Sequence, residues 1–250
     1  MINLIKEYLK LNEKQLFSKV RRELENYYDN VKVGPHGTYI YAEGDIPIVL
    51  VAHLDVVFKT SRQYMEIFYD QEEKVMWSPD GLGTDDRAGV LMIVWLLRCT
   101  EFRPCILFTT SEETDMRGAY YASIMNIKPN FVIELDRQGR GESVYYQCDN
   151  KEFEAYINSF GFNTAPGTYT DICLLCPSWG CAGVNLSVGY YDEHSYSEHW
   201  RVDDFLDTYV KLCNIFLDNQ EKYKFKFIRK EEKADVKRSK CENRGRKYNP

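Results

Sequence analysis

Short apolar runs that alternate with helix-like segments are the feature that most constrains the fold of this 250-residue chain. The run IVLVA within residues 47–54 is continuously apolar, as in a strand buried on both faces of a sheet. Further strands are expected at residues 39–42, 65–69, 74–77, 105–109, 131–135, 143–148 and 183–188. Helices are expected within residues 3–28, where Asn12 would cap the second of two, and at 87–98, 116–125, 151–159, 168–175 and 202–217. This alternation predicts an α/β fold with three α/β/α layers and a central mixed, mostly parallel sheet.

The length and charge distribution fit one large domain followed by a basic segment. We expect a single domain over residues 1–220 and a basic, partly disordered C-terminal tail over residues 221–250. The tail carries 12 basic and five acidic residues, although the net charge of the whole chain is −6. The acidic body argues against nucleic-acid binding, and only the basic tail could contact a nucleic acid or an acidic partner.

The apolar segments are too short for a membrane protein. None approaches the roughly 20 apolar residues of a membrane span, and residues 1–30 alternate apolar and charged positions instead of forming a signal peptide. We therefore expect a cytoplasmic protein without membrane contact. The eight cysteines are then interpreted as reduced thiols that mostly fill the core.

Acids and histidines gather where the expected strands end. The strings are VAHLD around His53, DGLGTDDRAG around Asp85, SEET around Glu113, IELD ending at Asp136 and DEHS at His194. Open α/β sheets bind their ligands at the carboxyl ends of strands. Two histidines and three acids in this order are the ligands that a pair of bridged divalent cations requires.

A second acid stands close to each of the first two candidate ligands, Asp55 near His53 and Asp86 next to Asp85. Asp55 stands two residues after His53, so both side chains point the same way in an extended segment, and Asp55 can hold the far ring nitrogen. A core histidine satisfied by a nearby carboxylate is the alternative. The adjacent carboxylates of Asp85 and Asp86 repel each other unless a cation binds one of them, although helix capping explains them equally well.

The next two strand ends carry acids of the same kind. Glu112 and Glu113 can have different roles, because one carboxylate can bind metal while the other stays free as the general base. Two exposed glutamates at the start of a helix are the alternative. Asp136 ends the apolar strand FVIEL, and a charge there needs a partner such as a metal or Arg137.

Two other spacings do not form metal motifs. His194 and His199 are five residues apart, which is not the i, i+4 spacing of a helical zinc pair, and we expect His199 on a surface helix. Cys173, Cys176 and Cys181 resemble half of a zinc knuckle. Because no second CxxC follows, we do not expect a structural zinc site there.

Together the strings resemble the motifs of the co-catalytic, two-metal zinc exopeptidase superfamily. The form is lid-free and single-domain, similar to zinc aminopeptidases and peptidase T-like enzymes, and the resemblance runs from about Val49 to Phe205. The family's HxD, DD, EE and HSPxE motifs are matched by His53-Leu-Asp55, Asp85-Asp86, Glu112-Glu113 and His194-Ser-Tyr-Ser-Glu198, with Tyr196 in place of the proline.

The resemblance implies a role for each of these residues. One cation would be held by His53, Asp85 and Asp136, and the other by Asp85, Glu113 and His194. Glu112, the general base, and Asp55 would be the catalytic residues. The resemblance further implies two divalent ions, zinc before cobalt or manganese, and a cis peptide bond between Asp85 and Asp86.

The absence of a lid favours one substrate polarity. Many relatives insert a lid or dimerisation domain before the last histidine, but only 57 residues lie between Asp136 and His194 here. The lid arginine that would bind a substrate carboxylate is therefore missing, which favours an aminopeptidase acting on short peptides or amino acid amides. Arg137 remains a candidate for binding a substrate carboxylate. The alternatives are a carboxypeptidase, an N-acyl amino acid deacylase or amidase, and a catalytically silent binding protein; the sequence does not give the oligomeric state.

Overall fold

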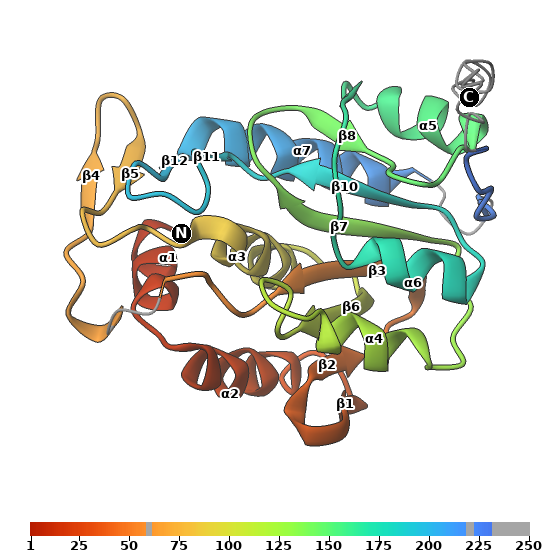
Figure 1. Cartoon of the computed structure of the whole chain (residues 1–250), viewed down its shortest axis with the longest axis horizontal. Coiled ribbons are helices and arrows are strands. Elements are labelled where there is room, and N and C mark those ends of the chain that lie inside the picture. The colour runs from red at the N-terminus through yellow and green to blue at the C-terminus, as the bar shows by residue number, and fades with distance from the viewer. Residues whose placement is uncertain (59–61, 219–222, 232–250) are drawn as a thin grey trace, which may run out of the picture.

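The computed structural model describes residues 1–58, 62–218 and 223–231, and a central eight-stranded sheet runs through this part of the chain (Figure 1). The strand order is β1-β2-β6-β3-β7-β10-β8-β9. The bounds are β1 (Val31–Val33), β2 (Tyr39–Ala42), β3 (Ile46–His53), β6 (Pro104–Thr109), β7 (Phe131–Arg137), β8 (Glu142–Val144), β9 (Asn163–Thr164) and β10 (Gly183–Ser187). The inner strands β6, β3, β7 and β10 are parallel, whereas β1, β2 and β8 pair antiparallel with their inner neighbours. The predicted mixed, mostly parallel sheet is confirmed.

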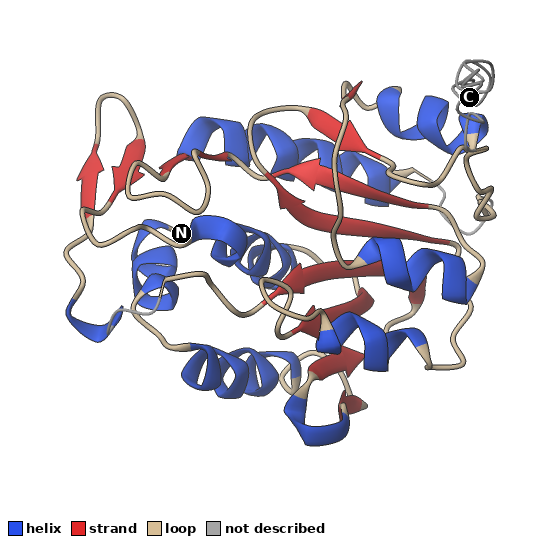
Figure 2. Cartoon of the chain, in the orientation of Figure 1, coloured by secondary structure: helices blue, strands red, loops and turns tan. Residues whose placement is uncertain are grey.

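Helices cover both faces of this sheet (Figure 2). One face packs against α1 (Ile2–Leu9), α2 (Glu13–Leu24), α3 (Thr84–Cys99), α5 (Lys151–Asn158) and α7 (Val202–Leu217), and the other against α4 (Arg117–Ser123) and α6 (Ile172–Trp179). Strand β3 explains how both faces are filled: Leu50 and Ala52 belong to the first core, whereas Val49 and Val51 belong to the second. The apolar IVLVA run is therefore buried on both sides, as its composition predicts.

Helices α2 and α7 lie where the sequence predicts them. Asn12 accepts a hydrogen bond from the Gln15 backbone N–H, and the Gln15 side chain accepts one from the Asn12 backbone N–H, at 2.9 and 3.0 Å. This capping box starts α2 at Glu13. The expected last helix, 202–217, coincides with α7.

A second, four-stranded sheet lies beside the main one, with the order β11-β12-β5-β4 (Figure 1, left). Its strands are β4 (Phe68–Asp70), β5 (Val75–Trp77), β11 (Tyr190–Tyr191) and β12 (His199–Arg201). The expectation that His199 lies on a surface helix is wrong, because His199 pairs with Trp77 of β5 in this sheet. Since β11 and β12 are hydrogen-bonded to each other, they fix both ends of the loop that carries His194.

Two elements near the site differ from their expected bounds. Strand β8 ends at Val144 because the chain then turns, and the Cys148 N–H donates to the Tyr145 carbonyl at 2.9 Å. Helix α6 starts at Ile172 instead of residue 168 and continues through Pro177. Its start is delayed because the side chains of residues 170 and 171 bond to the ends of neighbouring strands, as described below.

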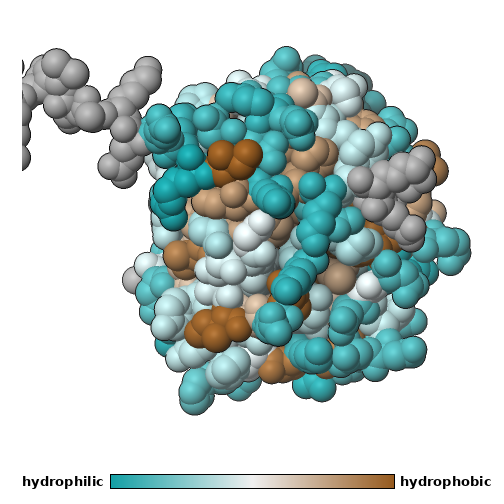
Figure 3. All heavy atoms as spheres, turned by 90° about the vertical axis from the view of Figure 1, so that its right-hand side faces the viewer, coloured by the Kyte–Doolittle hydropathy of each residue, from teal (hydrophilic) through white to brown (hydrophobic). Residues whose placement is uncertain are grey.

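The beginning of the basic segment packs against the body. Phe225 is buried, and its backbone exchanges hydrogen bonds with Asn130 and Ala182 at 3.1 and 2.9 Å. Figure 3 views this end of the molecule, at the amino ends of the parallel strands, where hydrophobic side chains form separate small areas among hydrophilic ones. The tail is expected to be partly disordered over residues 221–250, of which residues 221–222 and 232–250 lie outside the described residues. No helix in the described ranges is long and apolar enough to cross a membrane.

Candidate metal centre

The five expected ligands meet at the carboxyl ends of the central strands. His53 ends β3, Asp136 lies near the end of β7, and Glu113 follows β6. Asp85 is placed differently from the expectation: it belongs to the first turn of α3 and not to a strand end of the main sheet. His194 comes from the loop between β11 and β12. The structure therefore brings together residues from five separate segments.

These side chains form two groups that share Asp85. In each group, His53 with Asp85 and Asp136, or Asp85 with Glu113 and His194, the potential ligand atoms all lie within 4.8 Å of one another. Asp85 Oδ1 lies 3.1 Å from His53 Nε2, and Asp85 Oδ2 lies 3.0 Å from His194 Nε2. One carboxylate thus turns its two oxygens toward two different histidines. Imidazole nitrogens and carboxylate oxygens are donors that zinc accepts, so the residues present fit a pair of bridged divalent cations.

The second aspartate of the DD pair faces away from this centre. Asp86 Oδ2 accepts a hydrogen bond from the His53 backbone N–H at 3.2 Å, and Oδ1 accepts one from the Gly89 N–H at 2.8 Å. A side chain at position 89 would collide with the Asp86 carboxylate and with the Leu135 carbonyl, so glycine is required there. The Asp85–Asp86 peptide bond is cis, as predicted. The two adjacent acids therefore have separate surroundings, one in the centre and one at the backbone.

Asp55 joins the HxD and EE segments. Its Oδ1 lies 3.4 Å from His53 Nδ1, on the side of the ring opposite to Asp85. The same carboxylate accepts hydrogen bonds from the backbone N–H groups of Glu112 and Glu113, each at 3.1 Å. Asp55 therefore orients one candidate ligand through its ring and another through its backbone.

Three residues that the sequence analysis did not single out hold Asp136. The Tyr190 hydroxyl donates to Asp136 Oδ1 at 3.0 Å, and the Thr170 hydroxyl donates to Oδ2 at 3.2 Å. The Asn185 side chain accepts from the Asp136 N–H at 2.9 Å and donates to the Asp136 carbonyl at 3.0 Å. Of these, only Asn185 gave a signal in the sequence, as a polar residue inside the apolar segment AGVNLSV.

Glu198 fixes the turn that presents Asp85. Its Oε1 accepts hydrogen bonds from the Thr84 N–H and hydroxyl at 2.5 and 2.6 Å, and from the Asp85 N–H at 3.3 Å. Glu198 is fully buried and lies four residues after His194. The closing HSYSE string thus contributes one candidate ligand and one side chain that positions another.

Negative charge dominates the centre. Burial, with a smaller contribution from Asp85, raises the pKa of Asp136 to about 7. Burial, and to a lesser degree the charges of Asp136 and Glu113, raises the pKa of Glu112 to about 9. Hydrogen bonds to Asp85 and Glu113 raise the pKa of His194 to about 11. Each shift favours a bound proton, so this cluster of acids has the chemistry of a site that takes up positive charge.

The two remaining expected site residues have different surroundings. Glu112 belongs to neither ligand group and is half-buried, which leaves its carboxylate free to act on a bound molecule. Arg137 forms an ion pair with Glu142, whose Oε2 lies 3.0 Å from Nε and 2.9 Å from Nη2. Binding of a substrate carboxylate by Arg137 therefore stays a prediction.

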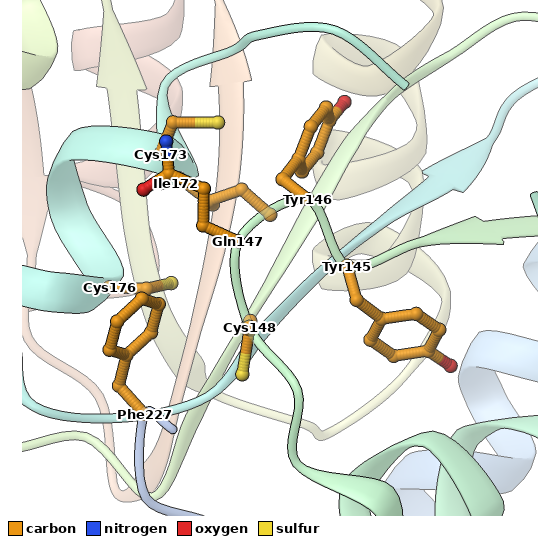
Figure 4. A pocket seen from close by; sticks show the side chains of 9 residues that line it. Tyr145, Tyr146, Gln147, Cys148, Ile172, Cys173, Cys176 and Phe227 are labelled. Carbon is orange, nitrogen blue, oxygen red and sulfur yellow. The ribbon is translucent and has the colours of Figure 1, made fainter. Parts of the chain in front are cut away.

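The cysteine cluster lies outside the metal centre. Cys173 and Cys176 on α6 line a cavity of about 10 Å³ together with Cys148, Tyr146 and Phe227 (Figure 4). All seven cysteines in the described part of the chain are free, and the two groups of metal-competent side chains found there include none of them. Four of these thiols are buried in the core, namely those of Cys105, Cys148, Cys176 and Cys181, whereas Cys173 and Cys213 are half-buried and Cys99 is exposed.

Comparisons with known proteins identify similar folds among solved structures. A tripeptidase from Staphylococcus aureus subsp. aureus Mu50 is 12% identical, with a TM-score of 0.68 over 86% of this chain and 96% of that chain. The aminopeptidase PepT from Bacillus cereus ATCC 10987 is 13% identical, with a TM-score of 0.66 over 86% of this chain and 96% of that chain. A TET aminopeptidase from the marine sediment archaeon Thaumarchaeota archaeon SCGC AB-539-E09 has the same identity, TM-score and coverage.

No family model and no curated protein matches the sequence. At 12–13% identity the likeness to the three solved structures is one of fold. The chain therefore shares its fold with these peptidases.

Proposed function

We propose that this protein is a two-metal aminopeptidase that removes the N-terminal residue of short peptides. The observation that carries the proposal is the position of Asp85, whose two carboxylate oxygens face His53 and His194 at 3.1 and 3.0 Å. The solved structures of similar fold support it, because they include a tripeptidase and aminopeptidases.

The proposal assigns a ligand set to each cation. His53, Asp85 and Asp136 would hold one, and Asp85, Glu113 and His194 would hold the other. Zinc suits these donors best, and cobalt and manganese are also compatible. When bound, such cations lower the pKa of a water molecule and polarise the carbonyl of the scissile bond.

Glu112 would move the proton. Its carboxylate takes a proton from the attacking water and delivers it to the amine that leaves. Burial raises the pKa of Glu112 to about 9, and the positive charge of two bound cations would lower it again, so that the carboxylate is ionised and can accept the proton. The hydrogen bond from its backbone N–H to Asp55, 3.1 Å long, keeps Glu112 beside the candidate ligands. Asp55 would act by orienting His53 and the Glu112–Glu113 segment.

The charges around the centre favour a free amino terminus in the substrate. Acidic side chains surround the candidate ligands, and the nearest expected carboxylate binder, Arg137, is already paired with Glu142. An acidic pocket attracts an ammonium group and repels a carboxylate. This favours an aminopeptidase over a carboxypeptidase acting with the same residues.

Kinetics on one dipeptide test the proposal. Leucylglycine would be supplied free, N-acetylated and C-amidated to the zinc-loaded protein, with N-acetyl-leucine as a fourth substrate. We expect hydrolysis of the free and amidated forms and at least a hundredfold slower hydrolysis of the acetylated form. Faster cleavage of the acetylated dipeptide than of the amidated one would refute the aminopeptidase. Release of acetate from N-acetyl-leucine alone would indicate a deacylase.

A further inference from the structure

The two carboxylate oxygens of Asp136 have different surroundings. Oδ1 lies 3.5 Å from His53 Nε2, the ring nitrogen that Asp85 Oδ1 approaches to 3.1 Å. In a tetrahedral site with zinc–ligand bonds of about 2.0–2.2 Å, neighbouring ligand atoms are about 3.3–3.6 Å apart. The two distances are close to this spacing, so Oδ1 is the oxygen of Asp136 that is placed to share a cation with His53 and Asp85.

The second oxygen, Oδ2, is bonded to a hydroxyl group of the protein. It accepts a hydrogen bond from the Thr170 hydroxyl at 3.2 Å, and Thr170 is buried. The next residue, Asp171, accepts a hydrogen bond from the Thr109 hydroxyl at the end of β6. The turn before α6 is thereby attached to both β6 and β7, so the Thr170 hydroxyl has a fixed position beside Oδ2.

Tyr190 holds Oδ1 from the second sheet. Its hydroxyl donates to Oδ1 at 3.0 Å, and its side chain is buried. The backbone of Tyr190 is fixed on two sides, because it pairs with Trp200 of β12 and its carbonyl accepts from the Gly139 N–H at 2.8 Å. Each oxygen of an ionised carboxylate has two lone pairs. The bond from Tyr190 occupies one lone pair of Oδ1 and leaves the other for a cation.

An aspartate held in this way binds a cation through one oxygen. To bind through both oxygens, the Asp136 carboxylate would have to turn Oδ2 toward the cation and give up the bond from Thr170. Catalytic zinc sites keep a coordination position open for water or substrate, whereas the protein fills every position of a structural site. A carboxylate limited to one oxygen keeps such a position open.

We infer that Thr170 and Tyr190 are positioning residues that restrict Asp136 to binding its cation through Oδ1 alone. Each acts through Asp136 and would not itself bind the cation. The inference rests on the proposed function, because it concerns the same centre, and it adds how that centre keeps a coordination position free.

Cobalt absorption tests the role of Thr170 in the absence of substrate. Co²⁺ replaces zinc in such sites, and its visible bands weaken when the coordination number rises above four. Thr170→Val keeps the side-chain shape and removes the hydroxyl, whereas Thr170→Ser retains the hydroxyl. Thr208→Val is the matched control, because the buried Thr208 hydroxyl donates to the Ser187 carbonyl at 2.6 Å instead of to a candidate ligand.

We expect Thr170→Val to lower the visible absorbance per bound cobalt, because the released Oδ2 becomes a further ligand. Thr170→Ser and Thr208→Val should keep the spectrum of the parent protein. A Thr170→Val spectrum identical to that of the parent, or the same change in Thr208→Val, would overturn the inference. If Thr170→Val does not fold, Thr170→Ala removes the same hydroxyl and is measured in its place.

Zinc affinity tests the role of Tyr190. Tyr190→Phe should raise the Kd for zinc about 10–100-fold, because Oδ1 loses the group that orients it. Tyr28→Phe is the matched control, since the buried Tyr28 hydroxyl donates to the Pro104 carbonyl at 2.7 Å, and it should leave the Kd unchanged. Equal Kd values for Tyr190→Phe and the parent would contradict the role of Tyr190.

Failure of the proposed function has a different signature. A protein that gives the expected cobalt and zinc results but does not cleave leucylglycine has the inferred centre without the proposed aminopeptidase activity. A protein that cleaves leucylglycine while Thr170→Val and Tyr190→Phe behave like the parent is the proposed enzyme without these positioning residues. A parent protein that binds no cobalt would overturn both.

Discussion

The Asp55 carboxylate accepts a hydrogen bond from the backbone N–H of Glu113 at 3.1 Å. Oδ2 of Asp55 is the acceptor in this bond. Oδ1 accepts a hydrogen bond from the Glu112 backbone N–H at 3.1 Å and lies 3.4 Å from His53 Nδ1. One buried acid thus connects His53, assigned to one cation, with Glu113, assigned to the other. The two halves of the proposed centre are therefore coupled through a residue that would bind neither ion.

Asp55→Ala should lower the affinity for zinc by about 10–100-fold, because the His53 ring and the Glu113 backbone both lose the group that orients them. Competition with a chromophoric chelator measures this affinity. Asp115→Ala, an exposed acid two residues after Glu113, is the matched control and should leave zinc affinity unchanged. Equal affinities in the two variants would contradict the role of Asp55.

Glu112→Gln should lower turnover of leucylglycine by about 10²–10⁴-fold, since it removes the group that accepts the proton of the attacking water. The metal content, measured by inductively coupled plasma mass spectrometry, should stay at the wild-type value. Glu113→Gln should instead lower metal content. If both substitutions removed metal equally, the roles of the two glutamates would be assigned wrongly.

Removal of metal should lower the melting temperature. A cation at the centre stabilises the native state by binding it in preference to the unfolded chain, by about 2.7 kcal/mol when its free concentration is 100 times the Kd. Scanning calorimetry would compare chelator-treated protein before and after zinc is restored. Asp85→Ala, which deletes the residue shared by both ligand groups, should melt at a temperature that zinc barely changes. A wild-type melting temperature insensitive to chelator would exclude tightly bound cations.

Glu198→Ala should destabilise the fold by about 1–3 kcal/mol, because the Thr84 and Asp85 backbone N–H groups would lose their acceptor in a buried turn. Glu198→Gln retains an oxygen acceptor and should cost less. Urea denaturation gives both values, and Ser197→Ala, at an exposed neighbouring position, serves as the control. A cost for Glu198→Ala no larger than for Ser197→Ala would show that the turn holds its shape without this carboxylate.

Local sequence patterns were sufficient to predict much of the fold. They failed for elements whose structure depends on contacts with residues far away in the chain. The IVLVA run and the amphipathic pattern of α7 depend on neighbouring residues, and both elements lie where expected. His199 has no such local signal, because its strand exists only through pairing with Trp77, which lies 122 positions earlier in the chain. Helix α6 starts late for a related reason, since Thr170 bonds to Asp136 of β7.

In the candidate site, too, the sequence predicted the residues that stand in local motifs and missed those that depend on distant contacts. Each of the five expected ligands stands in a short motif, and the structure brings the other four around Asp85. The residues that hold Asp136 come from positions 34 to 54 residues later and have no fixed spacing from it.

The central claim is that Asp85 bridges two cations, and anomalous diffraction from zinc-soaked crystals at the zinc absorption edge tests it most directly. We predict two peaks per chain, about 3.5–4 Å apart, with one Asp85 oxygen directed at each. One peak should lie beside His53 and Asp136, and the other beside Glu113 and His194. A single peak, or two peaks that Asp85 does not contact, would contradict the two-metal account.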